Sequence, residues 1–130
     1  MRRRACESSG PRRHGAQLQS NRSLYLSELC NDPQMIAAFS VTPIGVGESV
    51  SQWVADAVQI VRDSGLPNET NAMFTNLEGD WDEVMAVIKA CLMKVGEGSP
   101  RVSLVVKVDY RPGITDAIHS KVQAIDRRLS

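Results

Sequence analysis

The segment MIAAFSVT at residues 35–42 alternates along its whole length. Every second residue from 37 shares one apolar face: Ala37, Phe39 and Val41. The residues between them share the opposite face: Ala38, Ser40 and Thr42. A period of two is typical of a β-strand that buries one side. The segment therefore predicts a half-buried strand.

Two segments after this strand carry the spacing of amphipathic helices. Each opens with residues that can form a capping box, Ser49 with Gln52 and Asp80 with Glu83. Apolar residues then recur every three or four positions. The first pattern ends at Gly65, and the second ends before Gly96. We predict one helix in each segment.

The stretch ETNAMFTNLEG at residues 69–79 separates the two helices. Its composition predicts two short strands that form a hairpin around residues 73–75. RVSLVVKVD at 101–109 alternates again and predicts the last strand. Apolar residues at helical spacing from 114 to 129 then predict a C-terminal helix.

The resulting order is β-α-β-β-α-β followed by one helix. This order predicts an α+β, ferredoxin-like fold, in which two helices cover one face of an antiparallel sheet. The uncovered face gathers polar side chains from three strands: Ser40, Thr42, Asn76, Glu78, Lys107 and Asp109. Contact with solvent is enough to explain polar residues on such a face, so position alone does not make them a site.

The first 34 residues differ in kind from the remainder. They contain six arginines, three acidic residues and no apolar periodicity before residue 23, and they predict a disordered basic extension ahead of a domain at 35–130. Two alternatives are a mitochondrial transit peptide and an upstream extension before a natural start at Met35. We otherwise expect a cytoplasmic protein.

The charge of residues 35–130 and the length of the apolar runs exclude some classes of binding partner. Residues 35–130 hold nine Lys or Arg against twelve Asp or Glu, so a basic face for nucleic acid is not expected. The ferredoxin-like fold also occurs in RNA-binding domains, which stack bases on aromatic side chains of the third strand. The corresponding segment of this chain, FTNLEG, contains only one aromatic residue, Phe74. Apolar runs are too short for a membrane span, and a single soluble domain is predicted.

Cysteine and histidine positions argue against a metal site or a catalytic centre. Cys6, Cys30 and Cys91 lack zinc-site spacing and cannot all pair, which favours a reducing compartment. Cys91 lies on the apolar face of the second helix and is predicted to be a buried small hydrophobe. His14 and His119 have no partner spacing for a metal or a triad.

Three segments carry a family resemblance. They are MIAAFSVTPIGVGESVSQWVADAV at 35–58, MFTNLEGDWDEVMAVIK at 73–89 and RVSLVVKVD at 101–109. Together they resemble the small thiamine-binding proteins related to YkoF, whose members are ferredoxin-like and pair through their sheets into dimers or tetramers. The resemblance covers residues 35–111 and touches every element up to the last strand.

The resemblance implies binding of thiamine, or of its hydroxymethylpyrimidine half, without turnover and with no further cofactor or metal. It implies a homodimer or homotetramer formed through the sheets. The expected ligand-binding residues are Ser40, Thr42, Thr75, Glu78, Lys107 and Asp109. Carboxylates would meet the pyrimidine amino group or the thiazolium cation, hydroxyls the ring nitrogens, and Lys107 a carboxylate or an anion such as phosphate.

Two features of this set need resolution. Alternation places Thr75 on the face opposite Glu78, so Thr75 reaches the ligand only if the hairpin bulges. Thr42 lies at the far end of the first strand, roughly 20 Å from Glu78 and Asp109 at about 3.3 Å per residue. A pocket shared between two subunits would bring the parts together.

Two other functions stay open. An enzyme acting on a thiamine precursor would need Glu78 as acid or base, but no second activating group is apparent. An assembly module would use the open sheet face for protein contacts alone. Turnover identifies the enzyme, and a melting temperature that no thiamine-like ligand changes identifies the assembly module.

Overall fold

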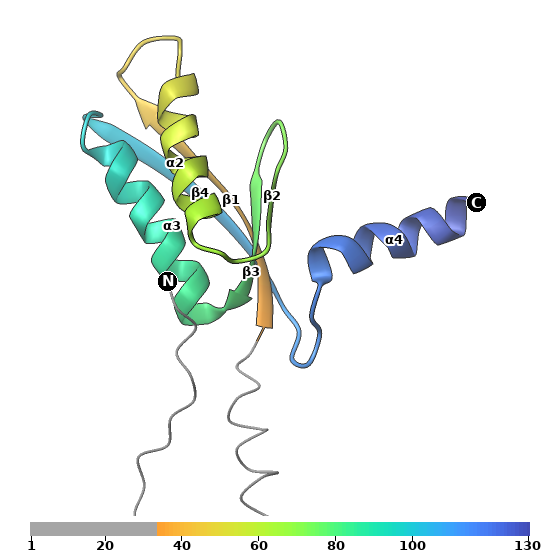
Figure 1. Cartoon of the computed structure of the whole chain (residues 1–130). Helices are drawn as coiled ribbons and strands as arrows, with labels where there is room; N and C mark the ends of the chain where they lie inside the picture. Colours follow the sequence, from red (N-terminus) through yellow and green to blue (C-terminus); the bar gives the residue numbers. More distant parts are fainter. Residues whose placement is uncertain (1–33) are drawn as a thin grey trace, which may run out of the picture. The chain divides into compact units, whose positions relative to one another are not determined.

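The computed structural model of the protein describes residues 34–130 (Figure 1). Its elements are β1 (Gln34–Ile44), α2 (Ser51–Asp63), β2 (Asn68–Thr70), β3 (Thr75–Asp80), α3 (Trp81–Gly96), β4 (Arg101–Tyr110) and α4 (Ala117–Leu129). The order confirms the predicted α+β, ferredoxin-like class with an added helix. The predictions of a disordered extension and of targeting, and those on Cys6, Cys30 and His14, fall on residues 1–33, outside the described part.

The strands form one antiparallel sheet in the order β2-β3-β1-β4. β1 is central, and its register sets Ile36 opposite both Glu78 of β3 and Asp109 of β4. Thr42 lies opposite Ser103 at the other end of the β1–β4 ladder. The end of β3 and the end of β4 therefore meet at the start of β1.

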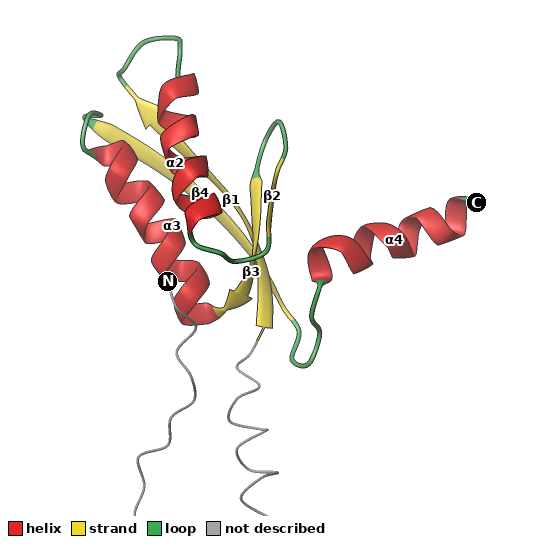
Figure 2. Ribbon diagram, in the orientation of Figure 1, coloured by secondary structure: helices red, strands yellow, loops and turns green. Residues whose placement is uncertain are grey.

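Helices α2 and α3 cover one face of this sheet (Figure 2). The apolar face predicted for β1 is buried beneath them, and Leu77 of β3 joins it. The helices contribute fully buried side chains: Val61, Val84, Ile88, Cys91 and Val95. Burying one aliphatic side chain of this size contributes about 1.5–3 kcal/mol, so this shared core holds the two layers together.

Helix starts follow the predicted capping in one case and depart from it in the other. The Asp80 carboxylate accepts a hydrogen bond from the Glu83 backbone N–H at 2.7 Å, as predicted for α3. The capping box predicted for α2 is wrong. Val50 is the N-cap residue and supplies no side-chain acceptor, so Ser49 lies one residue too early. Gln52 instead donates to a carboxylate one turn further along α2.

The hairpin turn lies two residues earlier than predicted. The side-chain oxygen of Asn71 accepts hydrogen bonds from the backbone N–H groups of Met73 and Phe74, both at 3.0 Å. The Asn71 N–H donates to the Phe74 carbonyl at 2.9 Å. An asparagine that replaces backbone partners in this way defines the turn, although no Asn-Gly pair marks it.

α4 begins at Ala117, three residues later than predicted, and extends from the loop after β4 (Figure 1). Ala117 and Ile118 in its first turn are buried. The apolar stripe continues along α4, yet Val122, Ile125 and Leu129 are 54%, 59% and 81% exposed. The first turn thus provides the buried contacts of the helix. Within residues 34–130 no helix has the length and apolarity needed to cross a bilayer.

Candidate functional site

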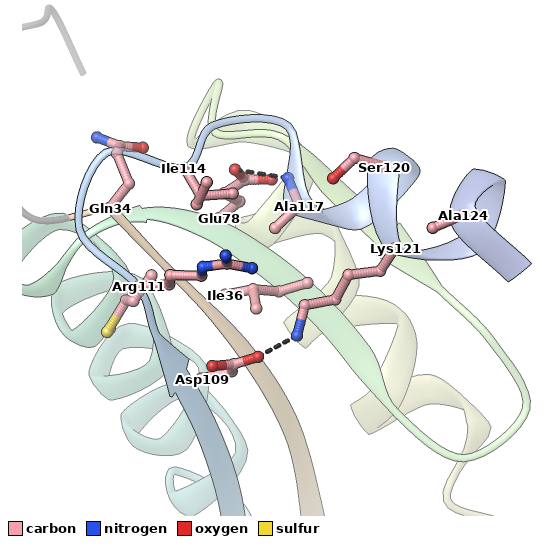
Figure 3. Close-up of a pocket in the computed structure, with 11 residues that line it drawn as sticks. Gln34, Ile36, Glu78, Asp109, Arg111, Ile114, Ala117, Ser120, Lys121 and Ala124 are labelled. Carbon is pink, nitrogen blue, oxygen red and sulfur yellow. Dashed lines mark hydrogen bonds and ion pairs between the residues drawn. The ribbon is translucent and has the colours of Figure 1, made fainter.

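A cavity of about 220 Å³ lies between the start of β1, the loop after β4 and the first half of α4 (Figure 3). Its charged and hydroxyl lining consists of Glu78, Asp109, Arg111, Ser120 and Lys121. Its apolar lining includes Met35, Ile36, Ile114, Ala117 and Ala124. The open face of the sheet forms one wall and α4 forms the other, so the site combines an apolar slot with charged edges.

Glu78 lies at the base of this site and is only 3% exposed. Its Oε1 accepts a hydrogen bond from the Ala117 N–H at 3.0 Å, and its Oε2 accepts one from the Ile118 N–H at 3.3 Å. The N-cap residue of α4, Asp116, makes no side-chain capping bond to the helix backbone. Glu78 therefore caps α4 from a different element and places its negative charge at the positive end of the helix dipole.

Asp109 forms the second contact between the sheet and α4. Its carboxylate pairs with the Lys121 ammonium group, which reaches down from the second turn of the helix (Figure 3). The hydrogen bond and charge of Lys121 lower the pKa of Asp109, with smaller contributions from Arg111 and Lys107. Three cationic side chains thus favour the negative charge of the Asp109 carboxylate, and Lys121 is the one that pairs with it.

Arg111 and Ser120 complete the polar lining. The Arg111 guanidinium points into the space between the sheet and α4 (Figure 3) and forms no hydrogen bond or ion pair with any residue of 34–130. The Ser120 hydroxyl also lacks a hydrogen-bond partner within that range. These two groups can bind a ligand without first releasing a protein partner.

Of the six predicted site residues, Glu78 and Asp109 meet in this cavity, on either side of Ile36. Lys107 lies two residues along β4, opposite Ala38, and does not line the cavity. Ser40 and Thr42 lie further along β1 on the same face of the sheet. Thr42 is six residues from Ile36, roughly 20 Å at about 3.3 Å per residue. The register thus leaves Lys107, Ser40 and Thr42 outside the cavity.

Thr75 lies on the other face of the sheet. It is 8% exposed and its Oγ1 lies 3.2 Å from that of Thr70. The β1–β3 register runs without a break from Phe39 opposite Thr75 to Gln34 opposite Asp80. The bulge that would turn Thr75 toward the cavity is therefore absent from the β1–β3 ladder.

Sequence reasoning missed Arg111, Ser120 and Lys121. The last two lie on one side of α4 with Ala117 and Ala124, at positions i, i+3, i+4 and i+7. Small side chains at this spacing let the helix approach the sheet closely, and that pattern was readable in the sequence. Arg111 sits in a Pro-Gly loop and had no comparable signal.

Two other reactive groups of the described part, Cys91 and His119, do not line the cavity. Cys91 is buried as predicted, and burial raises the pKa of its thiol to about 11, although its hydrogen bond to a backbone carbonyl opposes the shift. His119 Nδ1 lies 2.6 Å from Asp116 Oδ1 at the surface. Residues 34–130 contain no cluster of three His, Cys, Asp or Glu side chains placed to hold a metal ion.

Comparison with known protein families matches residues 37–126 to the family described as Thiamine-binding protein. UPF0045 protein Mb1933 of Mycobacterium bovis is 56% identical over 96 residues, which cover 73% of this chain and 94% of that protein. UPF0045 protein MJ1052 of Methanocaldococcus jannaschii is 37% identical over 92 residues, covering 71% and 92%.

Two solved structures show the same fold. The crystal structure of the Methanocaldococcus jannaschii protein superposes with a TM-score of 0.68 at 36% identity, over 72% of this chain and 97% of that one. A Thermotoga maritima protein named for thiamine biosynthesis or salvage superposes with a TM-score of 0.63 over 72% and 99%. Its identity is 22%, so this second likeness concerns the fold alone.

Proposed function

The chain belongs to the thiamine-binding protein family, and we propose that its cavity binds thiamine, or the hydroxymethylpyrimidine half of thiamine, without converting it. The observation that carries the proposal is the set of side chains that line the cavity. Two carboxylates that the resemblance singled out, Glu78 and Asp109, lie together in it. A protein of this kind serves as a carrier, buffer or sensor of its ligand, and we expect it in the cytoplasm.

The lining suits one small heterocycle. An aminopyrimidine needs apolar surface against its ring and a few hydrogen-bonding groups at its edge. Ile36 and Ile114 supply apolar surface, and the Asp109 carboxylate can accept a hydrogen bond from the exocyclic amino group. The volume of about 220 Å³ is below the roughly 300–1,000 Å³ of pockets that enclose drug-sized ligands. The pyrimidine ring therefore occupies the cavity, and the rest of whole thiamine extends from its open side.

Binding without turnover is supported by the way the carboxylates are engaged. Both oxygens of Glu78 accept backbone hydrogen bonds, and Asp109 is paired with Lys121. A catalytic acid or base must be within reach of the proton it transfers and exchange it during the reaction. Glu78 uses both oxygens to hold α4, whereas Asp109 pairs with Lys121 through Oδ2 and can still accept a hydrogen bond from a ligand at Oδ1. We therefore rank an enzyme acting on a thiamine precursor below a binding protein with no cofactor besides its ligand.

A second candidate function is self-assembly, and exposed apolar side chains favour it. The uncovered face of the sheet presents Val105, and α4 presents Val122, Ile125 and Leu129. A homodimer or homotetramer that buries these surfaces could also bring Ser40 and Thr42 of one copy near the cavity of another. The mass of the protein in solution tests this candidate.

A calorimetric titration of the full chain with thiamine and with hydroxymethylpyrimidine tests the binding function. We compare the wild type with Ala124→Leu, which adds bulk at the cavity wall while keeping a good helix former. Ala90→Leu, an exposed position on α3 away from the cavity, is the matched control. We expect saturable binding that Ala124→Leu weakens at least tenfold and that Ala90→Leu leaves unchanged.

Absence of heat and of a thermal shift for both compounds would contradict the binding function and leave self-assembly as the better candidate. Chromatography of the ligand recovered after incubation addresses turnover in the same samples. We expect unaltered ligand, and a converted product would instead establish an enzyme.

A further inference from the structure

The cavity holds four charged side chains, and three of them are engaged within the domain. Glu78 accepts two backbone hydrogen bonds from α4, and Asp109 pairs with Lys121. The guanidinium of Arg111 makes no hydrogen bond or ion pair with residues 34–130, although it lines the same space (Figure 3). The charge that remains available to a ligand is therefore positive.

The charges around Arg111 also leave the cavity with a positive charge available to a ligand. The N-terminus of α4 carries a partial positive charge that offsets the Glu78 carboxylate. Asp109 is offset by Lys121, and Lys107 adds a further positive charge within interaction range of that carboxylate. No negative side chain in the described lining is left to face Arg111 alone. An anionic group on the ligand is the partner that this arrangement accommodates best.

Ser120 supplies a second ligand group on the same side of the cavity. Its hydroxyl can donate a hydrogen bond and lacks a partner among residues 34–130. A guanidinium that offers several N–H donors, together with a free hydroxyl, is suited to the several acceptor oxygens of a phosphate group. The apolar residues of the slot remain free for the ring.

On the basis of the proposed function, we infer that the site selects the phosphate ester of hydroxymethylpyrimidine, with the phosphate bound by Arg111 and Ser120. The three ligands differ in the group attached to the methylene carbon of the pyrimidine, and this group sets the charge that faces Arg111. In thiamine this carbon bears the thiazolium cation, which Arg111 repels, whereas in the ester it bears a dianionic phosphate. The phosphorylated pyrimidine thus binds more tightly than either the free alcohol or thiamine.

The test is a calorimetric titration of the full chain at fixed, moderate salt with three ligands: hydroxymethylpyrimidine, its phosphate ester and thiamine. The variants are Arg111→Gln and a matched control, Arg101→Gln, at the exposed opposite end of β4. We expect the wild type to bind the ester about tenfold to a hundredfold more tightly than the alcohol, as a charge-assisted contact predicts. Arg111→Gln removes this preference but keeps the affinity for the alcohol within about twofold, and Arg101→Gln alters neither.

The outcomes separate the two levels of the proposal. If the wild type binds the alcohol and the ester equally, or if Arg111→Gln weakens both alike, phosphate selection is wrong while pyrimidine binding stands. If the wild type binds none of the three ligands, the proposed function itself is wrong, and phosphate selection is overturned with it.

Discussion

A carboxylate removed from water is costly unless its oxygens find donors, and Glu78 uses both of its oxygens on the first turn of α4. That contact gives Glu78 a structural role. The family resemblance predicts that Glu78 contacts the ligand. Its bonded partners show that it first of all positions α4, and so shapes the cavity wall that Ser120 and Lys121 provide.

Replacing Glu78 with glutamine tests this role. One carboxylate oxygen becomes an amide donor that faces a backbone N–H, so a capping bond is lost together with the favourable charge at the helix terminus. We expect the free energy of unfolding to fall by about 1–2 kcal/mol. Urea unfolding measures this loss, and hydrogen exchange should rise in residues 117–120. Glu69→Gln, exposed on β2, is the control. Unchanged exchange in α4 would show that the cap does not hold the helix.

His119 gives a prediction that depends on pH. The hydrogen bond and charge of Asp116 raise the pKa of His119 above its usual 6.5. Because the folded value is the higher one, the stabilisation is fully present below pH 6.5 and is lost as the pH rises through the raised pKa. NMR titration of the imidazole should give a pKa above 6.5 in the wild type and a lower one in Asp116→Asn. The same pKa in both proteins would rule out this pairing.

At the scale of elements, the loop from α3 to β4 packs closely against α2. A Cβ atom added at Gly98 would clash with the ring of Trp53, which itself packs on the core. Gly98→Ala forces a rigid indole to move, and we expect a loss of about 1–3 kcal/mol in the free energy of unfolding. Gly96→Ala is the matched control, because its nearest atom is 4.0 Å away. Denaturant unfolding that ranks the two variants equally would contradict the close packing.

The elements also show what a sequence can and cannot predict. The alternation of β1 and β4 and the helical spacing of α3 are local periodic signals, and each predicted its element. The predicted faces of β1 and α3 are buried, whereas that of β4 is only partly buried at Val102, Leu104 and Val106 and exposed at Val108. The turn at Asn71 and the start of α2 depend on which of several nearby polar side chains forms hydrogen bonds with the backbone. The cavity depends on more distant contacts: Glu78 and Ala117 are 39 positions apart, and no local pattern joins them.

At the scale of the whole molecule, the apolar surface of α4 predicts association between copies. Isolated exposed apolar side chains are ordinary, but three of them at helical spacing form a stripe. We expect sedimentation velocity to show a dimer or a larger oligomer for the wild type. Val122→Ser combined with Ile125→Ser should shift it toward the monomer. Met93→Ser, an exposed position on α3, should not. A monomeric wild type at micromolar concentration would contradict self-assembly.

The cap that Glu78 provides for α4 also has a consequence for the order in which the chain acquires its structure during synthesis. α4 leaves the ribosome after all four strands of the sheet, and the acceptor for its first turn comes from β3, completed much earlier. An isolated helix of 13 residues is marginal in water. α4 therefore depends on a partner that was synthesised before it, and the wall of the cavity can form only after β3 has left the ribosome.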